Sequence, residues 1–264
     1  MIQKRYEGFL NTPCLWKNNT VFNLQQFEIS SRLDKIELFL DEKLRLGKYV
    51  EQLVAFEIAQ QRGITPIAEN IQIQEGKRTL GELDCLLLRN NKPIHLEIIY
   101  KFYLFDATVG TTEIEHFIGP NRKDSLIEKL TKLKEKQLPL LYSDTCKSYL
   151  TNLGLNPKDI SQQVYFKAQL FVPFSIETIA LKTLNPECIT GFYINQTELH
   201  QFEDCKFYMP CKKDWLLVPH TNVNWLNFNA FKTTTKDYFE QKFSALCWVK
   251  FKSGQLKKMF LVWW

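Results

Sequence analysis

The sequence predicts an α/β protein with a mixed sheet, and three observations support this class. Residues 46–61 carry apolar side chains at three- and four-residue spacing, the pattern of an amphipathic helix. Residues 67–105 hold three stretches of period-two alternation joined by short turns. Residues 119–138 return to helical spacing, and residues 163–174 return to strand spacing. Helices packed on a mixed sheet would account for this order of helix, three strands, helix and strand.

The first helix is expected to run from Ser31 to Gln61, with Gly63 ending it and Pro66 starting an extended segment. Glu51 lies beside the apolar stripe of this helix, so its carboxylate either faces solvent or points into the protein. The stripe consists of Leu46, Tyr49, Val50, Leu53, Val54, Phe56 and Ile58. The orientation of the helix therefore decides whether Glu51 contributes to an internal site.

The three strands that follow read IAENIQIQE, TLGELDCLLLR and IHLEIIYKFYL. The turns EGKR and NNKP separate them, and both are too short for a crossover connection. The sequence therefore predicts an antiparallel meander over residues 67–105.

The second half of the chain continues with a loop at residues 106–118 and a helix over GPNRKDSLIEKLTKLKEKQL. A strand is expected at residues 163–174, and further strands at CITGFYIN and FYMPCKKDWLLVP. A helix is expected over TTKDYFEQKFSALCWV, and the final MFLVWW is expected to be a buried strand. We expect an N-terminal helical segment (1–45), a core (46–175) and a C-terminal α+β extension packed on the core (176–264).

Length and composition limit the classes of protein to which the chain can belong. A chain of 264 residues is long enough for one large domain or two small ones, and 45% hydrophobic residues exclude intrinsic disorder. No apolar run reaches the ~18 residues of a membrane-spanning helix, and the first residues lack the apolar core of a secretory signal. We therefore expect a soluble, cytoplasmic protein without a membrane partner.

The cysteine, histidine and charge patterns narrow the function classes. The seven cysteines form no C-x-x-C pair and the four histidines no H-x-x-x-H pair, which argues against a zinc ribbon, a redox motif or a zinc protease. The cysteines are expected to be reduced and to pack as small apolar residues. The net charge of +5 permits a polyanionic partner without requiring one. The densest basic stretch, residues 121–137, is typical of a solvated helix face, and nucleic-acid contact is the less common interpretation.

Strand alternation brings a group of charged residues together. On the third strand Glu97 and Lys101 share one face, and the turn NNKP can place Asp84 of the second strand beside Glu97. Glu51, projecting from the helix that covers the sheet, would complete an acidic cluster. Lys101 lies one pleat beyond Glu97, within reach of its flexible side chain.

This cluster has the chemistry of a magnesium site. Magnesium takes oxygen ligands, commonly one or two carboxylates, and substrate phosphate and water complete its octahedron. We expect Asp84 and Glu97 as metal ligands, Glu51 as an outer ligand or orienting residue, and Lys101 as the catalytic amine. The alternative is that these residues form only ion pairs, with Glu97 and Lys101 bridged along one strand.

At these residues the chain resembles an uncharacterised bacterial family, a domain of unknown function, within the PD-(D/E)XK nuclease superfamily. The stretches that carry the resemblance are LGKYVEQLVAF, RTLGELDCLL, HLEIIYKFYL and FIGPNRKDSLIEKLTKLKEKQLPL. They run from about residue 46 to residue 140, slightly over a third of the chain.

The resemblance implies a restriction-endonuclease-like α-β-β-β-α-β core, a divalent metal (Mg²⁺ or Mn²⁺) and cleavage of a phosphodiester bond. The acidic helix residue of the superfamily maps to Glu51, its aspartate to Asp84, and the acidic residue of its E-x-K element to Glu97. The second core helix often places basic or polar residues near substrate, which implies Asn121, Lys123 and Lys129 here.

The chain departs from the superfamily pattern at two positions. The usual lysine position holds Ile99, and Lys101 stands one step further along the same strand face. The residue before Asp84 is Leu83 instead of proline, which matters less because that residue supplies no ligand.

Two functions from different classes follow. The first is a Mg²⁺-dependent nuclease acting on DNA or RNA. The second is a catalytically inactive module that keeps the nuclease fold and binds nucleic acid or a protein partner. The displaced lysine favours the second, and the oligomeric state stays open, a dimer included.

Overall fold

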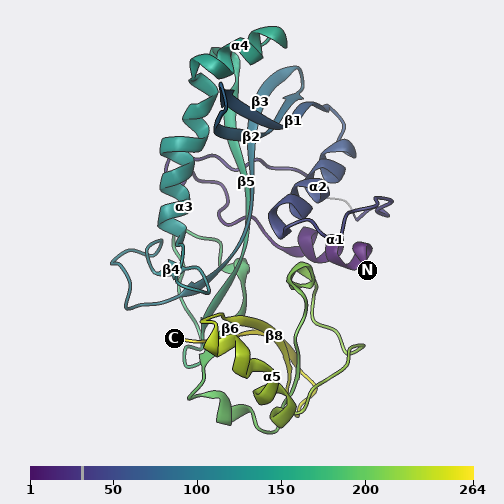
Figure 1. Ribbon diagram of the computed structural model, residues 1–264, viewed down its shortest axis with the longest axis vertical. Coiled ribbons are helices and arrows are strands. Elements are labelled where there is room, and N and C mark those ends of the chain that lie inside the picture. Colours follow the sequence, from purple (N-terminus) through teal and green to yellow (C-terminus); the bar gives the residue numbers. More distant parts are fainter. Residues whose placement is uncertain (31–32) are drawn as a thin grey trace. The chain divides into compact units, whose positions relative to one another are not determined.

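A computed structural model describes residues 1–30 and 33–264 of the chain. A nine-stranded mixed sheet with helices packed on it forms the framework (Figure 1). The strand order is β1-β2-β3-β5-β6-β9-β8-β7, and β4 pairs with β3. The expected mixed α/β class is confirmed.

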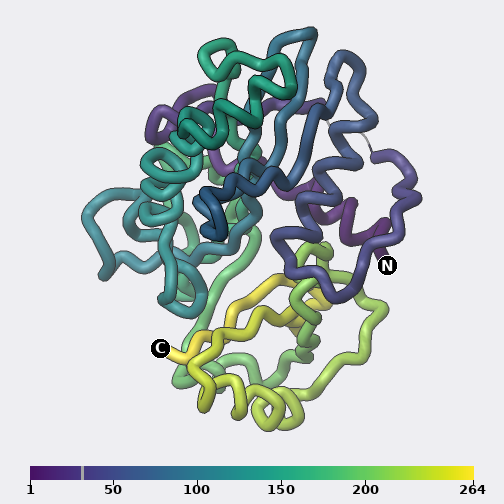
Figure 2. Tube along the Cα trace, turned by 45° about the horizontal axis from the view of Figure 1, so that its top comes forward, coloured from purple at the N-terminus to yellow at the C-terminus, as the bar shows by residue number. Residues whose placement is uncertain are grey.

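The chain forms two compact units, and each unit consists of several separate segments of the sequence. Figure 2 shows the course of the chain, coloured by residue number. The meander unit comprises residues 14–100 and 128–167. The terminal unit comprises residues 1–13, 101–127 and 168–264. The strands β3 and β5 contribute residues to both units.

The expected meander is confirmed in β1 (Ile64–Glu75), β2 (Arg78–Arg89) and β3 (Lys92–Phe105), which pair in antiparallel order. The turn between β2 and β3 consists of Asn90 and Asn91, with φ of 50° and 63°. Two successive positive φ values define the type I′ turn, whose twist suits a two-residue hairpin, and asparagine tolerates this conformation. This turn sets the register in which Arg89 faces Lys92.

Helix α2 runs from Leu46 to Ala59, which confirms only the second half of the predicted helix. Residues 33–45 contain no helix, and residues 31–32 of that prediction lie outside the described residues. The apolar stripe of the predicted helix begins only at Leu46, and Leu33 and Phe39 before it are exposed. A helix gains most of its stability from packing an apolar face, which explains why it begins at Leu46.

The helix predicted over residues 119–138 begins later than expected, at Leu126. Before it, Gly119 N donates to Asp124 O in a turn, and Arg122 has a φ of 55°. From Leu126 the chain forms consecutive helical segments: α3 (Leu126–Lys132), η1 (Leu133–Gln137), η2 (Leu138–Tyr142) and α4 (Asp144–Asn152). Figure 1 shows α4 and α2 on opposite sides of the meander strands. One side of the meander packs on η2 and α4 through Ile71, Ile73, Leu83, Leu141, Cys146 and Leu150.

The strand expected at residues 163–174 is confirmed as β5 (Ser161–Pro173), which η3 (Pro157–Asp159) precedes. In the terminal unit β6 is parallel to β5 and to β9, and β8 is antiparallel to β7 and β9. The strands are β4 (Phe117–Ile118), β6 (Ile189–Asn195), β7 (Lys206–Tyr208), β8 (Ala245–Lys250) and β9 (Leu256–Val262). The helical segments are α1 (Ile2–Asn11), η4 (Pro186–Cys188), η5 (Leu199–Phe202), η6 (Lys212–Leu216) and α5 (Phe228–Glu240). The strand predictions at CITGFYIN and at the buried MFLVWW are confirmed.

Two predictions in the terminal unit are wrong in part. FYMPCKKDWLLVP forms a strand only at its start, because Pro210 cannot donate to a ladder and the 3₁₀ segment η6 follows. TTKDYFEQKFSALCWV is helical only to Glu240, and Lys242 with a φ of 50° follows the helix end. Residues 245–249 are all buried and form strand β8, since a short apolar run suits a buried strand as well as a helix.

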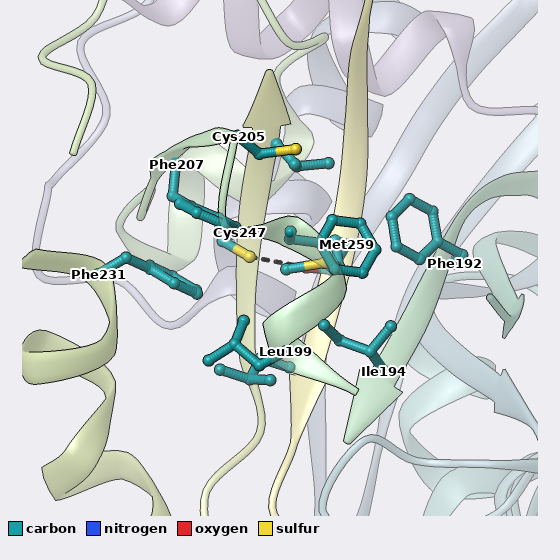
Figure 3. Packing of buried hydrophobic residues seen from close by; sticks show 11 residues of the cluster. Phe192, Ile194, Leu199, Cys205, Phe207, Phe231, Cys247 and Met259 are labelled. Atoms are coloured by element: carbon teal, nitrogen blue, oxygen red, sulfur yellow. Dashed lines mark hydrogen bonds between the residues drawn. The ribbon is translucent and has the colours of Figure 1, made fainter. Parts of the chain in front are cut away.

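The core of the terminal unit joins α5 to the sheet (Figure 3). The rings of Phe207 on β7 and Phe231 on α5 stack at 4.1 Å between centroids. Cys247 Sγ donates to Met259 O at 3.3 Å. All seven cysteines are free, and most are buried, as expected for small apolar residues. Among the described residues, every helix is too short or too polar to cross a bilayer.

Candidate functional site

Asp84 lies where the pairing of β2 with β3 ends. The last register pairs include Cys85 opposite Leu96, and one further step places Asp84 opposite Glu97. Asp84 Oδ2 accepts a hydrogen bond from Ile98 N at 2.9 Å, so the side chain takes the place of a backbone acceptor. The hydrogen-bonded pairing of β2 with β3 ends at this point. Asp84 and Glu97 therefore lie beside each other at the end of the paired region, as strand alternation predicts.

Glu97 is fully buried and is held from both sides. His95 Nε2 lies 3.1 Å from Glu97 Oε1, and Gln137 Nε2 donates to Glu97 Oε2 at 2.7 Å. Gln137 Oε1 in turn accepts from Lys129 Nζ at 2.8 Å, which fixes the orientation of the amide. Each oxygen of the Glu97 carboxylate therefore has one hydrogen-bonding partner, and the two partners fix its orientation.

Gln162 sets the hydrogen-bonding roles of the His95 ring. Gln162 Nε2 donates to Leu138 O at 2.7 Å and lies 3.0 Å from His95 Nδ1. An amide nitrogen only donates, so His95 Nδ1 accepts and His95 Nε2 donates to Glu97. Gln162 thus helps to orient Glu97 through the His95 ring.

Glu51 projects from α2 toward the strands and not into solvent, with 14% of its side chain exposed. Lys48, one turn earlier on α2, donates to Glu51 Oε2 at 2.8 Å and to Asn70 Oδ1 at 2.7 Å. The Lys48 amine also binds Glu82 on β2. Lys48 therefore ties the start of the helix to two strands and partly neutralises Glu51.

The carboxylates influence one another electrostatically. Burial and then the negative charge of Glu97 raise the pKa of Asp84 to about 7, the Ile98 amide opposes this, and Glu51 adds to the increase. Burial also raises the pKa of Glu51, against the effect of Lys48. The charges of Glu51, Asp84 and Glu97 thus act on one another, and the nearby positive charges only partly offset them.

The donor set fits a divalent cation at the Asp84–Glu97 pair. In residues 1–30 and 33–264 no group of three or more histidine, cysteine, aspartate or glutamate side chains is arranged to hold a metal ion. Magnesium needs only one or two protein carboxylates when substrate phosphate and water supply the other ligands. A cation at this pair would also compensate the repulsion that raises the pKa of Asp84. Asp84, Glu97 and Glu51 as metal ligands stay predictions.

The other predicted residues have contacts of their own. Lys101 belongs to the terminal unit, where its Nζ lies 2.7 Å from Asp124 Oδ2. Asn121 Oδ1 accepts from Ser244 N at 2.7 Å in the same unit, and Lys123 is exposed there. Lys129 lies in the meander unit and lowers the pKa of Asp84 slightly. Their roles in substrate binding stay predictions.

Sequence reasoning missed several residues of this network as site residues. The contact of Lys48 with Glu51 could have been predicted from the sequence, because the two residues are three apart on a helix and such positions are neighbours. The contact of His95 with Glu97 could also have been predicted, since the two residues are two apart on the same strand face. Gln137 and Gln162 come from distant parts of the chain, and no local pattern links them to Glu97.

The fold and the site define a mixed α/β protein with an acidic pair at the opening of an antiparallel meander. The chain belongs to the family described as Domain of unknown function (DUF1853), whose profile matches residues 13–262. Searches of curated proteins and of solved structures found no match.

Proposed function

We propose that the protein is a metal-dependent nuclease of the PD-(D/E)XK type, which hydrolyses phosphodiester bonds of nucleic acid at the Asp84–Glu97 pair. The observation that carries the proposal is the position of two carboxylates, Asp84 and Glu97, at the end of the β2–β3 pairing, where burial and the negative charge of Glu97 raise the pKa of Asp84 to about 7. The superfamily assignment rests on the order of helix, meander, helix and strand, together with the acidic positions 51, 84 and 97.

Each residue has a role that its contacts support. Asp84 and Glu97 would hold Mg²⁺ or Mn²⁺, which when bound polarises a phosphoryl oxygen and lowers the pKa of a bound water. His95 and Gln137 orient Glu97. Lys48 positions Glu51 at the edge of the pair.

The amine of the proposed site is Lys101. Lys101 is the amine suggested by strand spacing, and its ion pair with Asp124 must open before it can serve substrate. Ile99, at the usual lysine position, is buried at 4% exposure. This observation favours the second candidate function, a module that binds nucleic acid or a protein partner without cutting it.

A cleavage assay separates the two. Purified protein is incubated with single- and double-stranded DNA and with RNA, each with Mg²⁺ or Mn²⁺ and with chelator. We expect metal-dependent cleavage, and a loss of about 10²–10³-fold in Asp84→Asn and Glu97→Gln, because a catalytic metal supplies several kcal/mol of transition-state stabilisation. Circular dichroism should show that both variants keep the fold.

Glu75→Gln is the matched control, since Glu75 is an exposed carboxylate at the end of β1 in the same meander. Its activity should equal that of the wild type. Nucleic acid that stays intact with wild-type protein under every condition would contradict the nuclease. Salt-dependent binding that persists in chelator would then identify the binding module.

A further inference from the structure

The terminal unit contains a cavity of about 480 Å³, which Asp84 and Glu97 do not line. The segment before and within η6, the end of α5 and the start of β8 line it. The side chains that matter for binding are Lys212, Trp215, Asp237, Tyr238, Gln241 and Phe243. The size and the mixture of aromatic and polar groups are typical of a small-molecule site.

Lys212 supplies an amine that forms no ion pair in the part of the chain that the structure describes, although the charge of Asp124 acts on it from a distance. Its Nζ lies 3.2 Å from the centroid of the Trp215 ring and 5.4 Å from that of Phe102. Among the described residues no carboxylate forms an ion pair with it. The Lys212 side chain as a whole is open to solvent while its amine rests on the indole. Burial of the amine, and then the charge of Lys101, lower the pKa of Lys212.

Trp215 holds this amine in a defined position. The indole is 4% exposed, and the rings of Phe102 and Phe260 contact it edge-on at 5.1 Å and 5.2 Å. A fixed aromatic face under an ammonium group limits the positions that the amine adopts. The cavity therefore presents a positioned positive charge to any anion that enters.

The end of α5 supplies aromatic and hydrogen-bonding groups to the same cavity. Tyr238 and Phe243 are neighbours, with ring centroids 5.6 Å apart and planes inclined by 52°. Tyr238 and Phe243 are both partly exposed, so ring surface is available to a ligand. Asp237 and Gln241 are exposed on the last turn and offer a carboxylate and an amide. A planar heterocycle uses such groups for stacking and for edge recognition.

We propose that this cavity binds a nucleotide, with the base against Tyr238 and Phe243 and the phosphate at Lys212. A nucleotide combines an aromatic ring, hydrogen-bonding edges and an anion, and the cavity offers a group for each. The nucleotide is either free or part of a strand, because both present the same chemistry. The site lies in the terminal unit and does not depend on the proposed nuclease function.

Isothermal titration calorimetry with AMP, GMP, CMP and UMP tests this site, with adenosine and inorganic phosphate as partial ligands. We expect at least one mononucleotide to bind, and Lys212→Met to weaken that binding by tenfold or more. If AMP binds, adenosine affinity should be nearly unchanged in Lys212→Met, since adenosine lacks the phosphate. Lys206→Met is the control, because Lys206 is an exposed lysine of β7 that does not line the cavity.

A second variant fills the cavity. Gln241→Trp replaces an exposed residue at the end of α5, so the fold should tolerate it, and nucleotide binding should be lost. An oligonucleotide that competes for the site better than the mononucleotide would identify a strand as the source. No binding of any mononucleotide or oligonucleotide would overturn the proposal, as would binding that both variants leave unchanged. Titrations made in chelator exclude binding through a metal at the Asp84–Glu97 pair, which separates this test from the cleavage assay.

Discussion

The two compact units differ in the sign of the charge that they leave uncompensated. The meander unit gathers carboxylates where β2 and β3 part, and the positive charges near them are those of Lys48 and Lys129. The terminal unit instead buries Lys258, which is 3% exposed and donates to Gln169 Oε1 at 2.7 Å and to Trp215 O at 2.6 Å. Both acceptors are neutral, and within the described residues Lys258 has no carboxylate partner.

The comparison shows which ligand each unit is suited to bind. A buried charge without a partner of opposite sign is costly, and the cost appears as a shifted pKa. Asp84 has a raised pKa, which a cation would lower, whereas Lys212 has a lowered pKa, which an anion would raise. The same physical argument therefore predicts a metal in one unit and a phosphate-bearing ligand in the other.

The largest effect on stability is expected at Asp84. Its folded pKa of about 7 lies above its ordinary value, so the folded state binds the proton more tightly. This contribution to stability is present at pH below about 4 and is lost as the pH rises to about 7. Asp84→Asn, which keeps an acceptor for Ile98 N, should therefore raise the free energy of unfolding at pH 8 by about 1–4 kcal/mol, at roughly 1.4 kcal/mol per pKa unit.

Urea denaturation in chelator at pH 8 and at pH 5 measures this gain. The gain should be clearly smaller at pH 5, where Asp84 of the folded wild type is protonated. A variant that is less stable than the wild type at pH 8 would show that the Asp84 carboxylate is well compensated, and the contrast between the two units would fail.

An effect of the opposite pH dependence is expected at Lys258. Burial lowers the pKa of Lys258 to about 7, so the unfolded state binds the proton more tightly between pH 7 and about 10.5. The stability of the wild type should therefore rise over this range relative to that of Lys258→Met, by roughly 1 kcal/mol or more. The two lost hydrogen bonds reduce the benefit of removing the charge.

Lys257→Met is the matched control, because Lys257 is the exposed neighbour of Lys258 on β9. Chemical denaturation of all three proteins at pH 7 and at pH 9.5 gives the comparison. A pH dependence that is identical in Lys258→Met and Lys257→Met would mean that Lys258 titrates normally.

The fold was predictable where local patterns agree with tertiary packing. The meander followed from period-two alternation and from NNKP, whose two asparagines adopt the positive φ values that a tight hairpin needs. The prediction failed where a local pattern had no tertiary support. The predicted helix extended to residues 33–45, which precede its apolar stripe and expose Leu33 and Phe39, and residues 245–249 form a strand because they are buried in the sheet.

The acidic pair was predictable because strand register is a local property. Asp84 and Glu97 are separated by one hairpin, so alternation and the turn together place them opposite each other. The partners of Glu97 were not predictable, since Gln137 comes from 40 residues away in sequence. Hydrogen bonds between distant segments depend on how helices pack on the sheet, and a single sequence holds little information on this.

The most direct test of the account is metal binding at the acidic pair. Electron paramagnetic resonance during titration with Mn²⁺ counts bound ions without any need for substrate. The account predicts one site in the wild type at pH 8, binding weakened by tenfold or more in Asp84→Asn and Glu97→Gln, and no change in Glu75→Gln. A wild type without a stoichiometric site, or equal binding in all four proteins, would contradict it.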